Sequence, residues 1–67
     1  MIACNSCATA IDNADTSHIA EDDLSTVIGN IEEAGLLAMT HFSEVGLFVC
    51  DFCEYGYYGD SYKYEAA

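Results

Sequence analysis

Positively charged residues are nearly absent from this sequence. It contains no arginine and one lysine, Lys63, against twelve acidic residues, which gives a formal net charge of −11 at pH 7. Proteins gain much of their affinity for nucleic acids when Lys and Arg displace counterions from phosphates, and anionic membrane surfaces attract the same basic residues. The composition therefore excludes nucleic acid and membrane as direct partners, and it favours a basic protein surface.

Long apolar segments are also lacking. No apolar run approaches the roughly 18 to 20 residues that cross a bilayer, and the stretch from Met1 to Ala10 has no basic residue of the kind that opens a secretory signal. We therefore expect a cytoplasmic protein, or one of the host cytoplasm if the chain is encoded by a phage. Because disulfides are uncommon in that reducing compartment, paired cysteines there indicate metal binding or redox chemistry.

The chain is short for a stable fold. At 67 residues it lies in the size range where burial alone leaves little net stability and a metal or another cross-link is often needed. Its hydrophobic content of 52% exceeds that of chains that stay disordered. We predict a single domain over residues 1–59, followed by a flexible tail over residues 60–67 that is rich in tyrosine and acids.

One segment has the periodicity of an amphipathic helix. From Ala20 to Ala34, apolar residues recur at helical spacing and form one stripe: Ala20, Leu24, Val27, Ile28, Ile31 and Ala34. Acidic residues occupy the first turn, where the helix dipole favours negative charge, and Gly35 is placed to end the helix in a left-handed conformation. We predict a helix over 20–34 whose stripe faces the core.

Two apolar runs follow the helix. Leu36–Phe42 and Gly46–Cys50 are separated by Ser43, Glu44 and Val45, which predicts an antiparallel hairpin that ends at Cys50. A short strand over Tyr55–Tyr58 is also expected. The sequence thus predicts an α+β fold: a small zinc-stapled domain with one central helix packed on a β-hairpin.

The cysteines form the strongest motif. They lie in two C-x-x-C pairs, Cys4 with Cys7 and Cys50 with Cys53, near opposite ends of the chain. Four thiolates in two such pairs supply a complete tetrahedral shell for Zn²⁺, with no position left for water. We therefore predict a structural zinc ion and no enzymatic activity.

The two pairs, CNSC and CDFC, resemble the metal-binding turns of zinc-ribbon and zinc-knuckle modules. These turns commonly read C-P-x-C-G, whereas this chain has Ala8 and Glu54 in the glycine positions and contains no proline. The resemblance covers mainly the two turns. It implies a metal-bound scaffold in which two knuckles join the chain ends, and it does not imply a particular function.

Other interpretations of the cysteines stay open at this point. Iron in a rubredoxin-like site, a small dithiol redox protein, and cysteines that serve only as small buried apolar residues are alternatives to zinc. A thioredoxin-like pair requires a longer βαβ context and a cysteine at a helix N-terminus. His18 and His41 are reserve ligands that a four-cysteine site does not need.

The abundance of acidic residues and tyrosines indicates a protein-binding function. Ordinary surfaces intersperse both signs of charge, and tyrosine is favoured at interfaces. We predict a protein that binds and inhibits or regulates a basic protein surface, for example that of a nucleic-acid enzyme or nucleoprotein complex, by mimicking nucleic acid. In size and acidity the chain is similar to small phage-type inhibitors, including anti-CRISPR and anti-restriction proteins. The expected partner-binding residues are Asp22, Asp23, Glu32, Glu33, Asp51, Glu54, Tyr55, Tyr57, Tyr58, Asp60 and Tyr62. The alternatives are an adaptor or structural subunit of a protein complex, and an acidic surface that only keeps the protein soluble.

Overall fold

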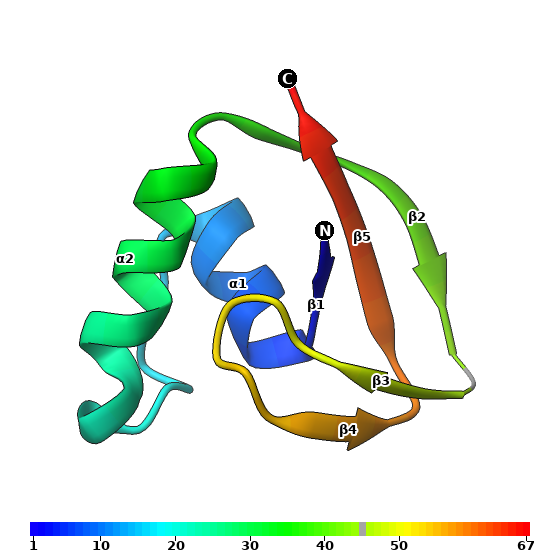
Figure 1. Cartoon of the computed structure of the whole chain (residues 1–67), viewed down its shortest axis with the longest axis horizontal. Helices are drawn as coiled ribbons and strands as arrows, with labels where there is room; N and C mark the ends of the chain where they lie inside the picture. The colour runs from blue at the N-terminus through cyan, green and yellow to red at the C-terminus, as the bar shows by residue number, and fades with distance from the viewer. Residues whose placement is uncertain (45) are drawn as a thin grey trace.

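The computed structural model describes residues 1–44 and 46–67 and has an α+β fold, as predicted (Figure 1). In chain order its elements are β1 (Ile2–Ala3), α1 (Asn5–Asn13), the 3₁₀ turn η1 (Glu21–Asp23), α2 (Leu24–Ala34), β2 (Leu37–Ser43), β3 (Leu47–Val49), β4 (Gly56–Tyr58) and β5 (Ser61–Ala66). The strands form two antiparallel sheets, one in the order β1-β5-β2 and one made of β3 and β4.

The C-terminal strand β5 lies at the centre of the larger sheet. It pairs with β1 on one side and β2 on the other, and the ammonium group of Met1 donates a hydrogen bond to the Tyr64 carbonyl at 2.7 Å. Residues 61–66 are therefore strand where a flexible tail was expected. Tyr62 and Tyr64, which are partly and fully buried, alternate with exposed Lys63 and Glu65. This period of two is the pattern of a strand with one buried face.

The predicted hairpin between residues 36–42 and 46–50 is wrong. Its connecting residue Val45 lies outside the described part of the chain, and the two runs pair elsewhere: β2 with β5, and β3 with β4. β2 has seven residues and finds a partner of matching length in β5, whereas the three residues of β3 match β4. The β3–β4 hairpin closes through the C-x-x-C turn itself, where the Cys50 N–H donates to the Tyr55 carbonyl at 2.9 Å. The expected short strand after this turn is confirmed as β4.

The predicted helix over 20–34 is confirmed, with η1 as its first turn. Val27 is fully buried, while Ile28 remains 40% exposed, so the buried stripe is narrower than the apolar pattern. Gly35 ends the helix at a φ of +77°. α2 packs through Val27 on a core that includes Phe52, which lies in the turn of the β3–β4 hairpin, and α1 lies between α2 and β1 (Figure 1). The helix therefore contacts a different hairpin from the one predicted over residues 36–50.

Helix α1 was not predicted, because a tight turn between extended arms was expected at CNSC. Only the first arm exists, as β1, and the chain is helical from Asn5 onward. The buried face of α1 comprises Cys7, Ala8 and Ala10, which are small residues that give a weak periodic signal. The helix ends at Ala14, which adopts a left-handed conformation with φ of +53°.

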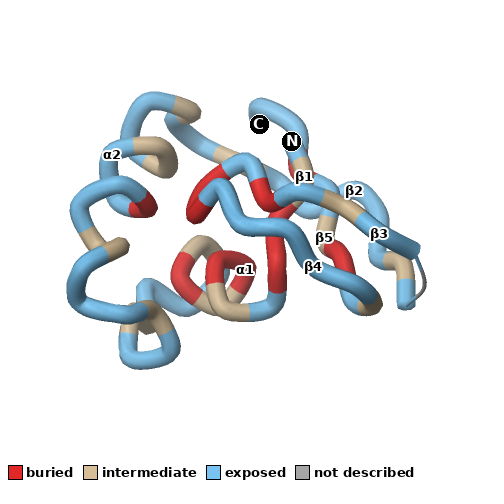
Figure 2. Tube along the Cα trace, turned by 60° about the horizontal axis from the view of Figure 1, so that its bottom comes forward, coloured by how far each residue is buried: buried red, intermediate tan, exposed pale blue. Residues whose placement is uncertain are grey.

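The core is small and built around sulfur. Figure 2 shows the buried segments gathered in β1, α1, the loop after β3 and part of β5. The buried cluster contains Ala3, Cys4, Cys7, Ala8, Val27, Cys50, Phe52, Cys53 and Tyr64. Because only Tyr64, Phe52 and Val27 among them are large, apolar burial alone supplies a modest driving force for so short a chain.

Within the described residues, no helix has the length and apolar character that crossing a membrane requires.

Candidate metal centre

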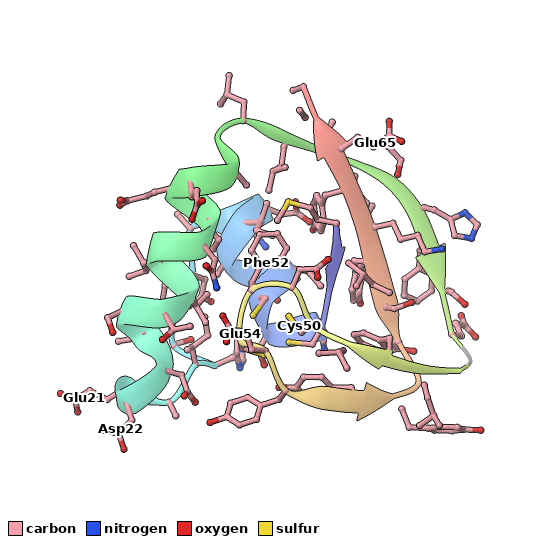
Figure 3. All side chains as sticks on the ribbon, in the orientation of Figure 1. Glu21, Asp22, Cys50, Phe52, Glu54 and Glu65 are labelled. Atoms are coloured by element: carbon pink, nitrogen blue, oxygen red, sulfur yellow. The ribbon has the colours of Figure 1, made fainter. Side chains whose placement is uncertain are left out.

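The four cysteines converge from both ends of the chain. Cys4 is the residue before α1 and Cys7 lies in its first turn, while Cys50 and Cys53 flank the turn between β3 and β4. Their four Sγ atoms all lie within 4.8 Å of one another. The residues are 3%, 0%, 0% and 9% exposed in that order, and Figure 3 shows sulfur atoms gathered beside the labelled Cys50.

The sulfur spacing fits a tetrahedral metal ion. With metal–sulfur distances of about 2.3 Å, the sulfurs of a tetrahedral zinc site lie about 3.8 Å apart. Cys4 Sγ and Cys53 Sγ are 3.9 Å apart. Since no pair exceeds 4.8 Å, the cluster needs to contract by no more than about 1 Å. All four cysteines are free thiols, so these residues could hold a metal ion.

Backbone N–H groups point at the sulfur of Cys50. It accepts hydrogen bonds from the N–H of Cys4 at 3.4 Å, of Phe52 at 3.4 Å and of Cys53 at 3.5 Å. The Tyr57 hydroxyl lies 3.4 Å from Cys53 Sγ. Donors around a sulfur favour its thiolate form and fix its orientation, which is the usual second layer of a metal site.

The pKa values of the Cys4 and Cys7 thiols are shifted in opposite directions. Hydrogen bonds from the Cys50 and Cys7 thiols lower the pKa of Cys4 to about 3. The pKa of Cys7 is raised, first because its thiol donates to Cys4 and then through Cys50 and burial. Such opposite shifts are expected of thiols that hydrogen-bond to one another at close range. A cation among them would replace the thiol protons, as metal binding to thiolates does.

Glu54 takes the place of the glycine of a zinc knuckle and keeps its backbone conformation. Its φ is +69°, in the left-handed region that glycine adopts without strain. Its N–H donates to the Cys50 carbonyl at 3.0 Å and closes the turn. The other departure, Ala8, lies inside α1. The second pair therefore resembles a knuckle turn, whereas the first lies at the start of a helix.

Several predicted partner-binding carboxylates are engaged within the fold. Asp51 accepts the Ile2 N–H at 2.7 Å, and Asp23 accepts the Tyr55 hydroxyl at 3.0 Å. Glu54 accepts the side-chain amide of Asn30 at 3.3 Å. These contacts connect the metal turn to β1, η1 and α2, so the three carboxylates have structural roles whether or not they also meet a partner.

The other predicted partner-binding residues are distributed over two regions. Asp22, Glu32 and Glu33 are exposed on η1 and α2, and Figure 3 shows Asp22 projecting from the start of that helix. The remainder lie on and after β4: Tyr57, Tyr58, Asp60 and Tyr62. Tyr57 stacks on Phe48 with ring centroids 5.8 Å apart, and Tyr62 contacts Phe42 at 4.9 Å. Their role toward a partner stays a prediction.

The two histidines lie in different parts of the fold, one beside the cysteine cluster and one on the larger sheet. His18 is exposed and lines a cavity of about 190 Å³ whose walls also include Cys4, Cys7 and Cys53. His41 lies on β2, opposite Lys63, in the larger sheet. Among the described residues, the group within metal-binding distance contains the four cysteines and neither histidine.

Two residues that position the site were not predicted. Phe52, inside the CDFC turn, is fully buried, and its carbonyl accepts the Asn30 amide at 2.7 Å. Asn30 thereby joins α2 to the metal turn. An apolar residue between two ligands of a knuckle is a usable signal for burial, whereas nothing in the local sequence identifies the role of Asn30.

Comparison with models of protein families, with curated proteins and with solved structures gives no match to this chain.

Proposed function

We propose that the four cysteines bind one structural Zn²⁺ that joins the two ends of the chain. The observation that carries this proposal is the convergence of four buried Sγ atoms within 4.8 Å. Four thiolates fill a tetrahedral shell, so the ion has no open position and its contribution is to stability. Zinc-binding free energies of about 10 kcal/mol or more exceed the whole folding stability expected of so small a core.

Cobalt substitution tests the ligand set. Co²⁺ bound by four thiolates gives intense visible absorption and sulfur-to-metal charge-transfer bands, so the full chain refolded with Co²⁺ is expected to be coloured. Cys50→Ser, which removes the sulfur that accepts three N–H groups, is expected to weaken these bands strongly. Ser6→Ala, between the first two ligands, is the control that should leave them unchanged. Elemental analysis of protein purified without added metal separates zinc from iron.

One observation favours a dithiol redox protein as a second candidate. The CNSC pair lies at a helix N-terminus, with Cys4 lowered and Cys7 raised in pKa, as in thiol oxidoreductases. Burial opposes this candidate, since Cys4 is 3% and Cys7 0% exposed, whereas a thiol that attacks a substrate disulfide must be reached. Disulfide reductase activity of the metal-free chain would favour the redox candidate, and its absence together with bound zinc would favour the structural site.

The zinc-stabilised domain binds a basic surface of another protein and inhibits or regulates it, with a nucleic-acid enzyme or nucleoprotein complex as the proposed partner class. The net charge of −11, with Lys63 as the one basic residue besides the histidines, supports this proposal. Asp22, Glu32 and Glu33 present exposed carboxylates along η1 and α2. Spaced carboxylates can occupy a groove built for phosphates and steer association with it.

Capture of host proteins on the immobilised, zinc-loaded chain tests this function. Partners held by charge are expected at low salt and should be lost at high salt, since surface charges are screened beyond about 8 Å at physiological ionic strength. Duplex nucleic acid should displace a partner whose nucleic-acid groove is occupied, and should leave the partner of a simple adaptor bound. The double substitution Glu32→Gln and Glu33→Gln should weaken capture more than Glu65→Gln, an exposed acid on β5.

A further inference from the structure

The outward side of the β3–β4 hairpin carries large apolar side chains that the fold leaves uncovered. The register places Leu47 opposite Tyr58 and Val49 opposite Gly56. Leu47, Val49 and Tyr58 are 82%, 62% and 78% exposed. Because side chains alternate along a strand, these three share one side, which we call the hairpin face, and Figure 2 shows β3 and β4 as mainly exposed segments at the surface.

The opposite side of the same hairpin is partly packed, with Phe48 half-buried and Tyr57 39% exposed. Phe48 and Tyr57 lie there, with ring centroids 5.8 Å apart, and the Tyr57 hydroxyl reaches Cys53 Sγ at 3.4 Å. The hairpin is therefore held by the metal turn through its inner side. Its outer side has no such role, and a contiguous apolar surface that the fold does not use is typical of an interaction site.

Gly56 leaves an open notch in the hairpin face beside Val49. A Cβ at this position would meet only the Phe48 carbonyl oxygen, at 4.0 Å, and the backbone there is not in the left-handed region. Neither space nor conformation in the described structure requires glycine. All six residues of β3 and β4 line a shallow, open hollow of about 520 Å³, so an apolar side chain of a partner has room next to Val49.

Acidic residues lie before and after both strands of the hairpin, and two of them, Glu44 and Asp60, lie toward the end of the hairpin that carries Leu47 and Tyr58. Glu44 precedes β3 and Asp51 follows it, while Glu54 precedes β4 and Asp60 follows it, and all four are exposed. The carboxylates of Asp51 and Glu54 accept hydrogen bonds from Ile2 and Asn30, so the acids assigned to the face are Glu44 and Asp60. The side chains of the face itself are uncharged. An apolar face with an acidic edge is complementary to an apolar segment that has basic residues on its flanks. A second copy of this chain is disfavoured, because pairing two such faces would bring like charges together.

We infer that the hairpin face binds an extended apolar segment of a partner protein that is flanked by lysine or arginine, with one side chain of the segment in the notch at Gly56. This inference rests on the proposed basic partner and names the surface and the recognition motif. It assigns the contact to Leu47, Val49 and Tyr58, and the electrostatic steering to Glu44 and Asp60.

Selection from a display library of random 12-residue peptides on the zinc-loaded full chain tests the inference. The expected peptides have an apolar centre and basic flanks. Binding of the best peptide, measured by fluorescence anisotropy, should fall tenfold or more with Leu47→Ser and with Gly56→Val, which fills the notch. Leu36→Ser is the matched control, because Leu36 is also 82% exposed but lies before β2, and it should bind as the unmodified chain does.

Gly56→Val also separates recognition from folding, since valine suits a strand better than glycine. The variant should retain the metal content and the thermal stability of the unmodified chain while losing the peptide. Selection of no peptide, or of peptides whose binding Leu47→Ser and Gly56→Val leave unchanged, would overturn the inference. So would concentration-dependent dimerisation in sedimentation velocity that Leu47→Ser abolishes.

The outcomes distinguish this inference from the function on which it rests. If basic peptides bind in a salt-dependent way that Leu47→Ser does not change, the hairpin face is not the binding site, but the proposed basic partner class is still supported. Apolar peptides without lysine or arginine whose binding depends on Leu47 contradict the basic partner class, and with it the proposed motif.

Discussion

Replacing Phe52 by alanine should weaken zinc binding although the phenyl ring is not a ligand. Phe52 is fully buried in the cluster that contains the four cysteines and Val27. Phe→Ala substitutions at such sites cost about 3–5 kcal/mol, from lost transfer free energy and the cavity that remains. When the metal-free chain is unfolded, zinc binding includes the free energy of folding. The same 3–5 kcal/mol then appears as a loss of zinc affinity of roughly two to four orders of magnitude.

Competition with a chromophoric chelator measures this loss. The matched control is Phe42→Ala, because Phe42 is 41% exposed and contacts Tyr62 at the sheet surface. Partial exposure and a single ring contact predict a cost of about 1 kcal/mol, which is less than tenfold in affinity. If Phe52→Ala reduces zinc affinity no more than Phe42→Ala, folding and metal binding are not coupled and the reasoning is refuted.

Other substitutions test the strained turn, a buried tyrosine and the thiolates. Ala14→Gly should stabilise the zinc-loaded protein by about 1 kcal/mol in denaturant titration, because glycine relieves the positive φ of this residue, +53°. Glu54→Gly, at φ of +69°, should gain less, because it also removes the carboxylate that accepts the Asn30 amide, and a loss of stability in Ala14→Gly would contradict the argument. Burial first, and then the hydrogen bond to Asp12 at 3.0 Å, raises the pKa of Tyr64 above its ordinary value of 10. Because the pKa of Tyr64 is higher in the folded than in the unfolded state, the protonated tyrosine contributes its full stabilisation below about pH 10. This stabilisation is lost as the pH rises through the folded-state pKa. Tyr64→Phe should therefore cost about 1 kcal/mol at pH 7 but make alkaline unfolding less steep, and an unchanged alkaline transition would contradict it. Acid should release the metal, because protons compete for the thiolates; cobalt bands that persist at pH 4 would contradict thiolate ligation.

The sequence identified the elements whose signals are local. The stripe through Val27 and Ile31 predicted α2, and Gly35 marked its end. The two cysteine pairs predicted their own cluster, because ligands at equal spacing are informative wherever they lie in the chain. The α+β class followed from these features.

The misses have physical causes. Strand pairing depends on which distant segment completes a sheet, and β2 found β5 at the end of the chain and not its neighbour β3. The sequence analysis predicted a flexible tail where β5 lies, because tyrosine, lysine and acids are polar overall. The alternation of tyrosine with charged residues from Tyr62 to Glu65 nevertheless indicates a strand with one buried face. α1 was hidden because Cys7, Ala8 and Ala10 are too small to give a strong hydrophobic period.

Native mass spectrometry of the full chain before and after chelation tests the central claim most directly. The account predicts one zinc ion per chain in a narrow, low charge-state distribution, which becomes broad and highly charged once the ion is removed, because the small core around the cysteines then loses the ion that stabilises it. A metal-free chain that keeps the narrow distribution would contradict the account.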